Sequence, residues 1–407
     1  MKITGITTHL LSANWAAVDK QWEDTGGGYK SSALVRIETD AGITGIGEII
    51  IGYFAPEAVP TLVDYFIPHL IGKDPLQTNA LWNRMYESAK WWGRSGAAVS
   101  VISGIDIALW DIKGKALGVP VHTLLGGLMH ERMPVYASIG GIPDNLDEAV
   151  TAVRRWVDEG FRAVKLGQIS NERFGYDTIE GVYIDRPSTA EFALDSARRF
   201  VKLRESFGPG VDFIIHNHMG SQAWPLPMNL NEAVRVLQAL EPASLLFAEE
   251  PLPYEDIAGY ADLRQRTKTP IAGGEMLAGL HEFAAFINAR ALDIVQPDVS
   301  FCGGITTTWE VMQLASANFI RTALHMGGSF GPAYAAGLHL SFAHKDAIIL
   351  ETLPVAMPLI REVLQFPLTL VDGGFAPPPS DLPGLGVDVS EDILRRHPFV
   401  PGSGERG

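Results

Sequence analysis

The pattern of apolar and polar positions changes twice along the chain. Up to about residue 50 it alternates with a period of two, in residues 2–6, 33–38 and 43–47, around a turn at 40–42. This pattern predicts a small antiparallel sheet with one face in water. From residue 60 to about 117 the period becomes helical, most clearly over residues 99–115. Residues 1–126 are therefore predicted to form a compact α+β unit at the start of the fold.

Beyond Gly126, short runs rich in valine, isoleucine and alanine alternate with amphipathic helical stretches. The eight runs are residues 134–138, 163–165, 213–215, 246–248, 270–272, 294–296, 322–324 and 348–350. Strands that alternate with helices predict a parallel sheet, and eight such units close into a TIM-type (β/α) barrel, here over residues 127–356. The alternative, an open doubly wound sheet, requires a G-x-G-x-x-G turn after its first strand, and residues 138–143 do not contain one.

The tail, residues 357–407, is rich in proline and glycine. Residues 368–371 and 386–389 have the character of short strands. We expect them to pack back on the first unit, which the tail would then complete as a capping domain.

Composition excludes several classes of function. The 407 residues are 46% hydrophobic, and 47 acidic against 32 basic residues give a formal net charge of −15 with no run of five Lys or Arg. Such a chain lacks the basic footprint of a nucleic-acid-binding protein, and its apolar stretches are too short or too interrupted to cross a membrane. Cys302 is the single cysteine, and the start of the chain has no signal-peptide pattern. We expect a soluble cytoplasmic protein.

Polar residues follow seven of the eight predicted strands. They are Lys165, His216 and His218, Glu249 and Glu250, Glu275, Asp298, His325, and Glu351. Each has an ordinary explanation when taken singly: a solvated loop start for the Glu249 pair, a helix N-cap for Asp298, a core histidine for His325 and an ion-paired lysine for Lys165. Barrel enzymes build their active sites from this rim, so the whole pattern favours a catalytic centre.

The residue types indicate metal-assisted proton transfer on a carboxylate. Glu249 and Glu275 follow neighbouring strands, about 5 Å apart in a sheet, and can converge on one hard divalent cation. A cation there can bind a substrate carboxylate and stabilise the charge that forms when the α-proton leaves. His325 can remove that proton, with Asp298 accepting the Nδ1 proton and orienting the ring.

With these residues, the sequence resembles the mandelate racemase branch of the enolase superfamily along nearly its whole length. The motifs that carry the resemblance are residues 104–118 (Gly-Ile-Asp-Ile-Ala-Leu-Trp-Asp and its continuation), Glu249-Glu250-Pro251-Leu252, Gly274-Glu275, Gln296-Pro297-Asp298, Gly303-Gly304-Ile305-Thr306, His325 and Glu351. The resemblance implies Mg²⁺ held by Glu249 and Glu275, an Asp298–His325 dyad, and Glu351 as the acid that hydrogen-bonds the enolate oxygen. It also implies that the capping loops with Trp22 and Tyr53 close over the substrate and select it; alternatively, Tyr53 is an ordinary exposed aromatic residue.

Two positions depart from the family pattern. Racemases carry Lys-x-Lys after the second strand, but here the sequence is Lys165-Leu166-Gly167, so the second base is missing. Lys165 remains and is expected to hold the substrate carboxylate. Sugar-acid dehydratases carry Asp-x-His after the third strand, and here His216 takes the metal-ligand position while His218 matches the acid. An imidazole ligand favours softer metals than magnesium, so another divalent metal is an alternative, as is Asn217 as the ligand.

Taken together, the motifs predict a metal-dependent hydro-lyase that acts on a small-molecule carboxylate, an aldonate, and yields a 2-keto-3-deoxy acid. One base, His325, and one acid, His218, suffice for this β-elimination. Two alternatives remain: an epimerase or cycloisomerase of the same superfamily, and a barrel that binds a sugar acid without turning it over. The resemblance also implies a homo-oligomer.

Overall fold

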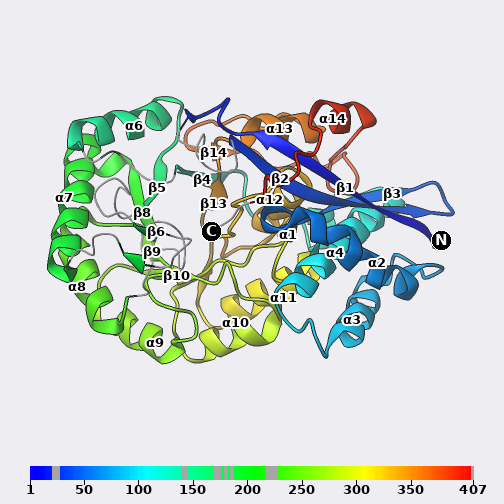
Figure 1. Ribbon diagram of the computed structural model, residues 1–407, viewed down its shortest axis with the longest axis horizontal. Helices are drawn as coiled ribbons and strands as arrows, with labels where there is room; N and C mark the ends of the chain where they lie inside the picture. The colour runs from blue at the N-terminus through cyan, green and yellow to red at the C-terminus, as the bar shows by residue number, and fades with distance from the viewer. Residues whose placement is uncertain are drawn as a thin grey trace.

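The computed structural model describes residues 1–20, 28–139, 143, 145–167, 176–177, 182–183, 188–216 and 228–404. The first part of the chain forms a three-stranded antiparallel sheet, β1 (Ile3–Asn14), β2 (Tyr29–Thr39) and β3 (Thr44–Ile49). The helices that follow it are α1 (Ile51–Phe54), α2 (Val59–Leu70), α3 (Thr78–Ala89), α4 (Ala97–Leu117) and α5 (Val121–Leu124). The meander and the helical segment predicted from the periodicities are both confirmed. Figure 1 shows this part in blue and cyan beside the barrel.

The capping sheet is buried on both faces along β2, so the expectation of a wet face is wrong for this strand. Ala33, Val35 and Ile37 pack in an apolar cluster with the capping helices. Leu34, on the opposite face, belongs to the large cluster that includes the barrel. Alternation with a period of two identifies a strand, but it cannot show that a second domain covers the more polar face.

Helix α4 lies unusually close to strand β3, and glycines permit the approach. A Cβ on Gly47 would lie 1.8 Å from the carbonyl oxygen of Gly104, and a Cβ on Gly104 would lie 2.2 Å from the side chain of Ile49. Neither position has room for a side chain. The helix therefore fixes β3, and with it the face of the sheet that meets the barrel.

Eight parallel strands form the barrel, as the sequence predicts. In chain order they are β4 (Met133–Ser138), β5 (Ala163–Gly167), β8 (Asp212–His216), β9 (Phe247–Glu249), β10 (Ile271–Gly273), β11 (Ile294–Val295), β12 (Arg321–Thr322) and β13 (Leu350–Thr352). Each pairs with the next as far as β12, and β13 returns to β4. An isolated bridge between Thr322 of β12 and Ala347, three residues before β13, closes the sheet. A separate antiparallel pair consists of β6 (Tyr176–Asp177) and β7 (Val182–Tyr183).

Helices surround the sheet (Figure 1). They are α6 (Leu146–Asp158), α7 (Thr189–Phe207), α8 (Leu230–Leu240), α9 (Ile257–Arg266), α10 (Gly279–Asn288), α11 (Gly304–Ala317) and α12 (Pro332–Ala343). Local sequence sets several of their starts: Asn229 caps α8 through the backbone N–H of Glu232, whose side chain bonds back to Asn229. Among the described residues, no helix is both long enough and apolar enough to cross a bilayer.

One ring of side chains fills the barrel interior, with one residue from each strand or its flank. The ring consists of Tyr136, Ala163, Ile214, Phe247, Ala272, Ile294, Ala323 and Ile349. Large and small members share the ring, which is how side chains fill a barrel of this size. The next inward-facing residues along each strand lie one layer closer to the carboxyl ends of the strands.

The tail contacts the capping sheet, but residues 368–371 and 386–389 are not strands, contrary to expectation. They make only isolated bridges, Val371 with Gly374 and Val387 with Leu364. The regular elements of the tail are α13 (Met357–Val363), β14 (Gly374–Phe375), which pairs with β4, and α14 (Glu391–Arg396). Proline and glycine in the tail interrupt any longer ladder. The chain beyond α14 reaches β1, where the backbone N–H of Ser12 bonds to the carbonyl oxygen of His397 at 3.4 Å.

A buried histidine pair joins α5, α12 and the tail. The Nε2 atom of His339 lies 3.2 Å from the carbonyl oxygen of Leu385, so Nε2 donates and Nδ1 accepts. His339 Nδ1 lies 3.1 Å from both the backbone N and Nδ1 of His122. This arrangement requires a neutral His339, and burial together with the neighbouring His122 lowers the pKa of His339 to about 3.

We expect the His339 pair to make the protein less stable as the pH falls below about 6.5, the usual histidine pKa. The unfolded chain binds a proton there that the folded His339 does not, so the free energy of unfolding falls by roughly 1.4 kcal/mol per pH unit. Urea unfolding of the wild type and His339→Gln between pH 7 and 5 tests this. The variant should show the smaller slope, and equal slopes would contradict the assignment.

Candidate functional site

Five of the catalytic candidates lie in the second inward layer of the barrel, because side chains two residues apart on a strand share a face. Lys165 comes two residues after Ala163, His216 two after Ile214, and Glu249 two after Phe247. His325 and Glu351 follow Ala323 and Ile349 at the same spacing. The alternation that fills the core thus also directs these polar side chains to the centre of the rim.

Lys165 lies between two acids of this layer. Its Nζ atom is 2.6 Å from Glu249 Oε1 and 2.6 Å from Glu351 Oε1, and all three side chains are 1% exposed. Burial would lower the pKa of Lys165, but the two carboxylates raise it well above the usual value. The Lys165 ammonium is therefore charged, and it balances the charges of two carboxylates in a layer that is buried from solvent.

Asp298 and His325 form the predicted dyad. His325 Nδ1 lies 2.7 Å from Asp298 Oδ2, and the other carboxylate oxygen, Oδ1, accepts bonds from the backbone N–H and hydroxyl of Ser300 at 2.8 and 2.6 Å. A carboxylate can only accept, so Nδ1 carries the proton. The opposite ring atom, Nε2, lies 3.3 Å from Glu275 Oε2 and 3.7 Å from Glu351 Oε2.

Acids control the charge of this histidine. Burial lowers the pKa of His325, but Glu275, Glu351 and Asp298 outweigh that effect and raise it to about 10. Burial has the opposite effect on an acid and raises the pKa of Glu351. The positive charges of Lys165 and His325 outweigh burial and bring this pKa below the usual carboxyl value. Glu351 Oε2 also accepts the backbone N–H groups of Met326 and Gly327 at 2.8 and 3.1 Å. The site thus fixes Glu351 as a carboxylate beside the base candidate.

The acids suit a divalent cation by their chemistry. Glu249 ends β9 and Glu275 follows β10, so the two oxygen donors come from neighbouring strands of one rim. His216 lies beside Glu249 in the β8–β9 register. No group of three His, Cys, Asp or Glu side chains is poised to hold a metal within the described part of the chain. Glu249 and Glu275 are the type of oxygen donor that a hard cation prefers, and His216 is a nitrogen donor beside Glu249.

The capping domain brings one of the two predicted aromatic residues to this rim. Tyr53 lies in α1, and its ring would lie 3.2 Å from a Cβ on Gly328, three residues after His325. Trp15 and Phe54 contact the same ring, with centroids 5.8 and 5.1 Å away. Tyr53 is therefore packed against the loop that follows β12 and carries His325, and it is not an exposed loop residue. Trp22, Asn217 and His218 lie outside the described residues.

Two residues of the site were not predicted as functional. Gln296 donates from Nε2 to Glu249 Oε2 at 2.6 Å and so fixes the second oxygen of that acid. Tyr136 lies beside Lys165, with the ammonium 5.5 Å from the ring centroid. Gln296 could have been predicted, because it belongs to the Gln-Pro-Asp motif. Tyr136 looks like an ordinary strand residue in the sequence, and its contact with Lys165 is apparent only once the barrel has closed.

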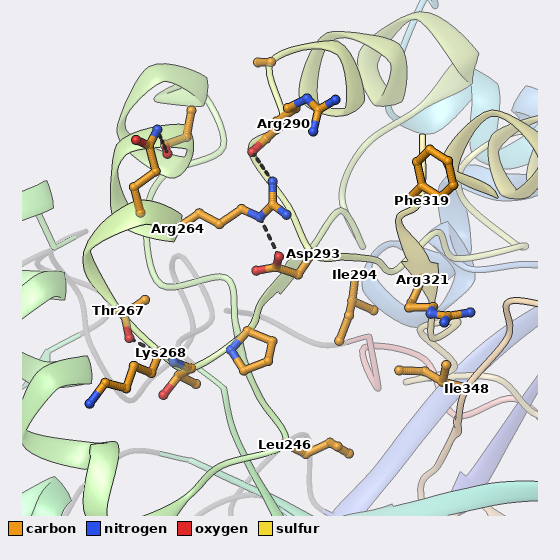
Figure 2. Close-up of a pocket in the computed structure, with 15 residues that line it drawn as sticks. Leu246, Arg264, Thr267, Lys268, Arg290, Asp293, Ile294, Phe319, Arg321 and Ile348 are labelled. Carbon is orange, nitrogen blue, oxygen red and sulfur yellow. Dashed lines mark hydrogen bonds and ion pairs between the residues drawn. The ribbon is translucent and has the colours of Figure 1, made fainter. Parts of the chain in front are cut away.

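A surface cavity of about 840 Å³ lies at the opposite end of the barrel (Figure 2). Its lining includes Leu246, Asp293 and Ile348, which lie just before barrel strands. Figure 2 shows Arg264 between Asp293, at 2.5 Å, and the carbonyl oxygen of Arg290, at 3.0 Å. Basic residues complement the negative ends of the helices that finish here. Barrel enzymes react at the other rim, so this cavity is not the catalytic site.

Family models match both parts of the chain. The one described as the mandelate racemase / muconate lactonizing enzyme N-terminal domain covers residues 6–126, and the one described as the enolase C-terminal domain-like family covers residues 148–393. The chain belongs to the enolase superfamily, in its mandelate racemase branch. Members of this superfamily generally use Mg²⁺.

Curated relatives of this chain include D-galactonate dehydratases. D-galactonate dehydratase of Xanthomonas campestris pv. campestris (strain B100) is 34% identical over 406 residues, which cover 97% of this chain and 94% of that protein. The D-galactonate dehydratase of Ralstonia nicotianae is 35% identical, with the same shares covered. The family and these relatives identify the chain as an enzyme of the hydro-lyase class.

Solved structures include more than one reaction. An enolase from Agrobacterium radiobacter, provisionally assigned as a galactarate dehydratase and bound to sodium and L-malate, superimposes with a TM-score of 0.82 at 27% identity, covering 98% of this chain and 96% of that one. The 3,6-anhydro-D-galactonate cycloisomerase of Zobellia galactanivorans has a TM-score of 0.79 at 28% identity, covering 98% and 99%. The fold alone therefore does not select the reaction, and the residues of the site must.

Proposed function

We propose that this enzyme removes water from an aldonate and releases a 2-keto-3-deoxy acid. The observation that carries the proposal is the His325–Asp298 dyad on the same rim as Lys165, Glu249, Glu275 and Glu351. The dyad orients one imidazole nitrogen toward the reacting centre, and the missing second lysine after Lys165 argues against two-base racemisation. The dehydratase relatives support the same reaction.

A divalent cation, Mg²⁺ in the first instance, is proposed to lie between Glu249 and Glu275, with His216 or Asn217 as a further ligand. When bound, it would hold the substrate carboxylate and offset the charge of the acids around it. Lys165 presents a positive charge to the same carboxylate from the side of Glu351.

The protein's own groups then move two protons. In its neutral form, His325 accepts the C2 proton at Nε2 while Asp298 holds the ring through Nδ1. The surrounding acids favour the protonated ring, and a cation held by Glu249 and Glu275 would offset their charge and so favour the neutral ring.

By the family resemblance, Glu351 hydrogen-bonds the oxygen on which charge collects; because Glu351 is a carboxylate, the proton of that bond comes from the Lys165 ammonium, which lies 2.6 Å from Oε1. His218, the acid by family resemblance, protonates the C3 hydroxyl as its C–O bond breaks. Water leaves, and the enol so formed tautomerises to the 2-keto-3-deoxy acid.

A screen of acid sugars tests the proposal. We expect purified protein with Mg²⁺ to convert at least one acid sugar to a 2-keto acid, detected by semicarbazide absorbance. His218→Asn should abolish the 2-keto product while C2–H exchange with solvent continues, because the two protons move through different residues.

The rival functions give different results. An epimerase or cycloisomerase would release a product that retains the water, visible by NMR. A binding protein would bind the acid with no exchange at C2. Either result, or an inert library with magnesium, manganese and zinc, would overturn the dehydratase proposal.

A further inference from the structure

Gln296 is a buried amide in the second inward layer of the barrel, two residues after Ile294 of β11. The residue is 1% exposed, and its Nε2 atom donates to Glu249 Oε2 at 2.6 Å. A carboxylate can only accept hydrogen bonds, so the amide nitrogen faces Glu249 and the amide oxygen faces away from it. Gln296 therefore contacts one of the two acids proposed to hold the cation.

The amide oxygen indicates that packing alone does not explain this side chain. Gln296 Oε1 is buried and has no hydrogen-bond partner within the part of the chain that the structure describes. A buried polar atom without a partner costs free energy, and an unbranched apolar side chain such as methionine would fill the space without that cost. What the amide adds at this position is the bond from Nε2 to Glu249.

The amide reaches Glu249 across an intervening strand. Strand β11 pairs with β10, and β10 pairs with β9, so the backbones of Gln296 and Glu249 are about 10 Å apart in the sheet. The residue two after Ala272 of β10 is Gly274, so no side chain from that position lies between them. The backbone N–H of Gln296 donates to the carbonyl oxygen of Gly273 at 2.9 Å, which fixes the point from which the side chain extends.

Glu249 is held at both of its carboxylate oxygens. Lys165 Nζ lies 2.6 Å from Oε1, and Gln296 Nε2 lies 2.6 Å from Oε2. Two partners on different oxygens fix the plane of the carboxylate as well as its position. Lys165 contributes a positive charge, whereas the neutral amide of Gln296 orients the carboxylate without offsetting the negative charge that attracts a cation.

One short segment after β11 orients two groups of the site. Gln296 holds Glu249, and Asp298, two residues later, holds His325 through Nδ1 at 2.7 Å. Pro297 lies between them and restricts the backbone of the segment. The distance between the proposed metal ligand and the proposed base is therefore fixed from a single strand end.

We propose that Gln296 is a positioning residue, which orients the carboxylate of Glu249 for a divalent cation. Its relation to Glu249 is the relation of Asp298 to His325. The inference rests on the proposed function, which places the cation between Glu249 and Glu275. Loss of a partner that orients a metal ligand typically lowers metal affinity by about 10- to 100-fold.

Binding of Mn²⁺ to the substrate-free protein tests the role of Gln296. Manganese takes the same oxygen donors as magnesium, and the electron paramagnetic resonance signal of the free ion reports binding without turnover. We expect Gln296→Met, which removes the donor, to raise the Kd for Mn²⁺ by about 10- to 100-fold. Gln296→Asn should have the same effect, because its amide is one methylene too short to reach Glu249. As a control, Gln265→Met removes an exposed glutamine and should leave the Kd unchanged.

A magnesium titration of the reaction separates positioning from a general structural defect. We expect Gln296→Met to need about 10- to 100-fold more Mg²⁺ for its half-maximal rate. Most of kcat should return at saturating Mg²⁺, because the variant leaves the Asp298–His325 dyad in place. A disordered or loosely packed site would instead lose kcat at every Mg²⁺ concentration.

The outcomes separate this inference from the proposed function. If Gln296→Met binds Mn²⁺ as tightly as the wild type does, or if excess Mg²⁺ does not restore kcat, the inference fails and the dehydratase proposal stands. If the variant binds Mn²⁺ more weakly but the wild type converts no acid sugar, the dehydratase proposal fails and the positioning role stands. If the wild type binds neither ion, Glu249 is not a metal ligand and the inference fails. If Gln296→Met does not fold, the Kd of Gln296→Asn decides in the same way.

Discussion

Replacing His325 with asparagine is expected to lower kcat for sugar-acid dehydration by about 10²- to 10⁴-fold, the usual contribution of a general base. It should also stop the exchange of the C2 proton with solvent. The asparagine amide would preserve a polar group near Asp298 but would have no atom able to accept the proton that Nε2 takes. The two effects can be measured on one sample, by following 2-keto acid formation and loss of the C2–H signal in D₂O by NMR.

Controls assign the effect to the dyad. His281→Asn removes an exposed histidine on α10 and should leave the rate unchanged. Asp298→Asn should fold, but its amide can donate to Nδ1, which moves the ring proton to Nε2 and removes the base form. If His325→Asn retains C2 exchange and loses only water elimination, His325 is the acid and the proposed order of proton transfers is wrong.

The sequence predicts the barrel and its rim because one rule governs both. Inward-facing residues alternate along each strand, so an apolar run that fills the core must be followed by side chains that face the centre of the rim. Ala163 precedes Lys165 and Ala323 precedes His325 by this rule. All eight predicted strands are confirmed, within a few residues, for the same reason.

Contacts between distant strands could not be predicted in this way. Lys165 and Glu249 are separated by 84 residues, and their ion pair depends on how β5, β8 and β9 lie in the closed sheet. The sequence offered an ordinary ion pair as an alternative to a substrate-binding role for Lys165; the structure shows the ion pair, and the substrate role stays a prediction.

The capping domain shows a second limit. A strand pattern shows which residues share a face, but not what covers that face. One face of the sheet was expected to be in water, but β2 is buried on both faces, and even Lys30 is 1% exposed. The two strands predicted in the tail were wrong for a related reason: a strand-like composition does not show whether another strand is available to pair with it.

Replacing Lys165 with methionine is expected to destabilise the protein by about 3–5 kcal/mol, the usual effect of removing one partner of a buried ion pair. Methionine fills a similar volume, but it removes the positive charge between the carboxylates of Glu249 and Glu351, which then repel each other. Water cannot screen this repulsion, because the side chains of Lys165, Glu249 and Glu351 are each 1% exposed. Urea unfolding, followed by circular dichroism, gives the free energy of unfolding of the wild type and the variant.

A double-mutant cycle separates lost attraction from lost packing. Glu351→Gln alone should also destabilise, because Lys165 loses one of its two carboxylates, whereas Lys165→Met combined with Glu351→Gln should be more stable than the sum of the two changes predicts. The exposed Lys73→Met should change the free energy by less than about 0.5 kcal/mol. Two results would contradict this prediction: additive effects in the cycle, or a loss of less than about 1 kcal/mol of unfolding free energy for Lys165→Met. Either would mean that Lys165 does not balance the charges of Glu249 and Glu351 in the proposed site.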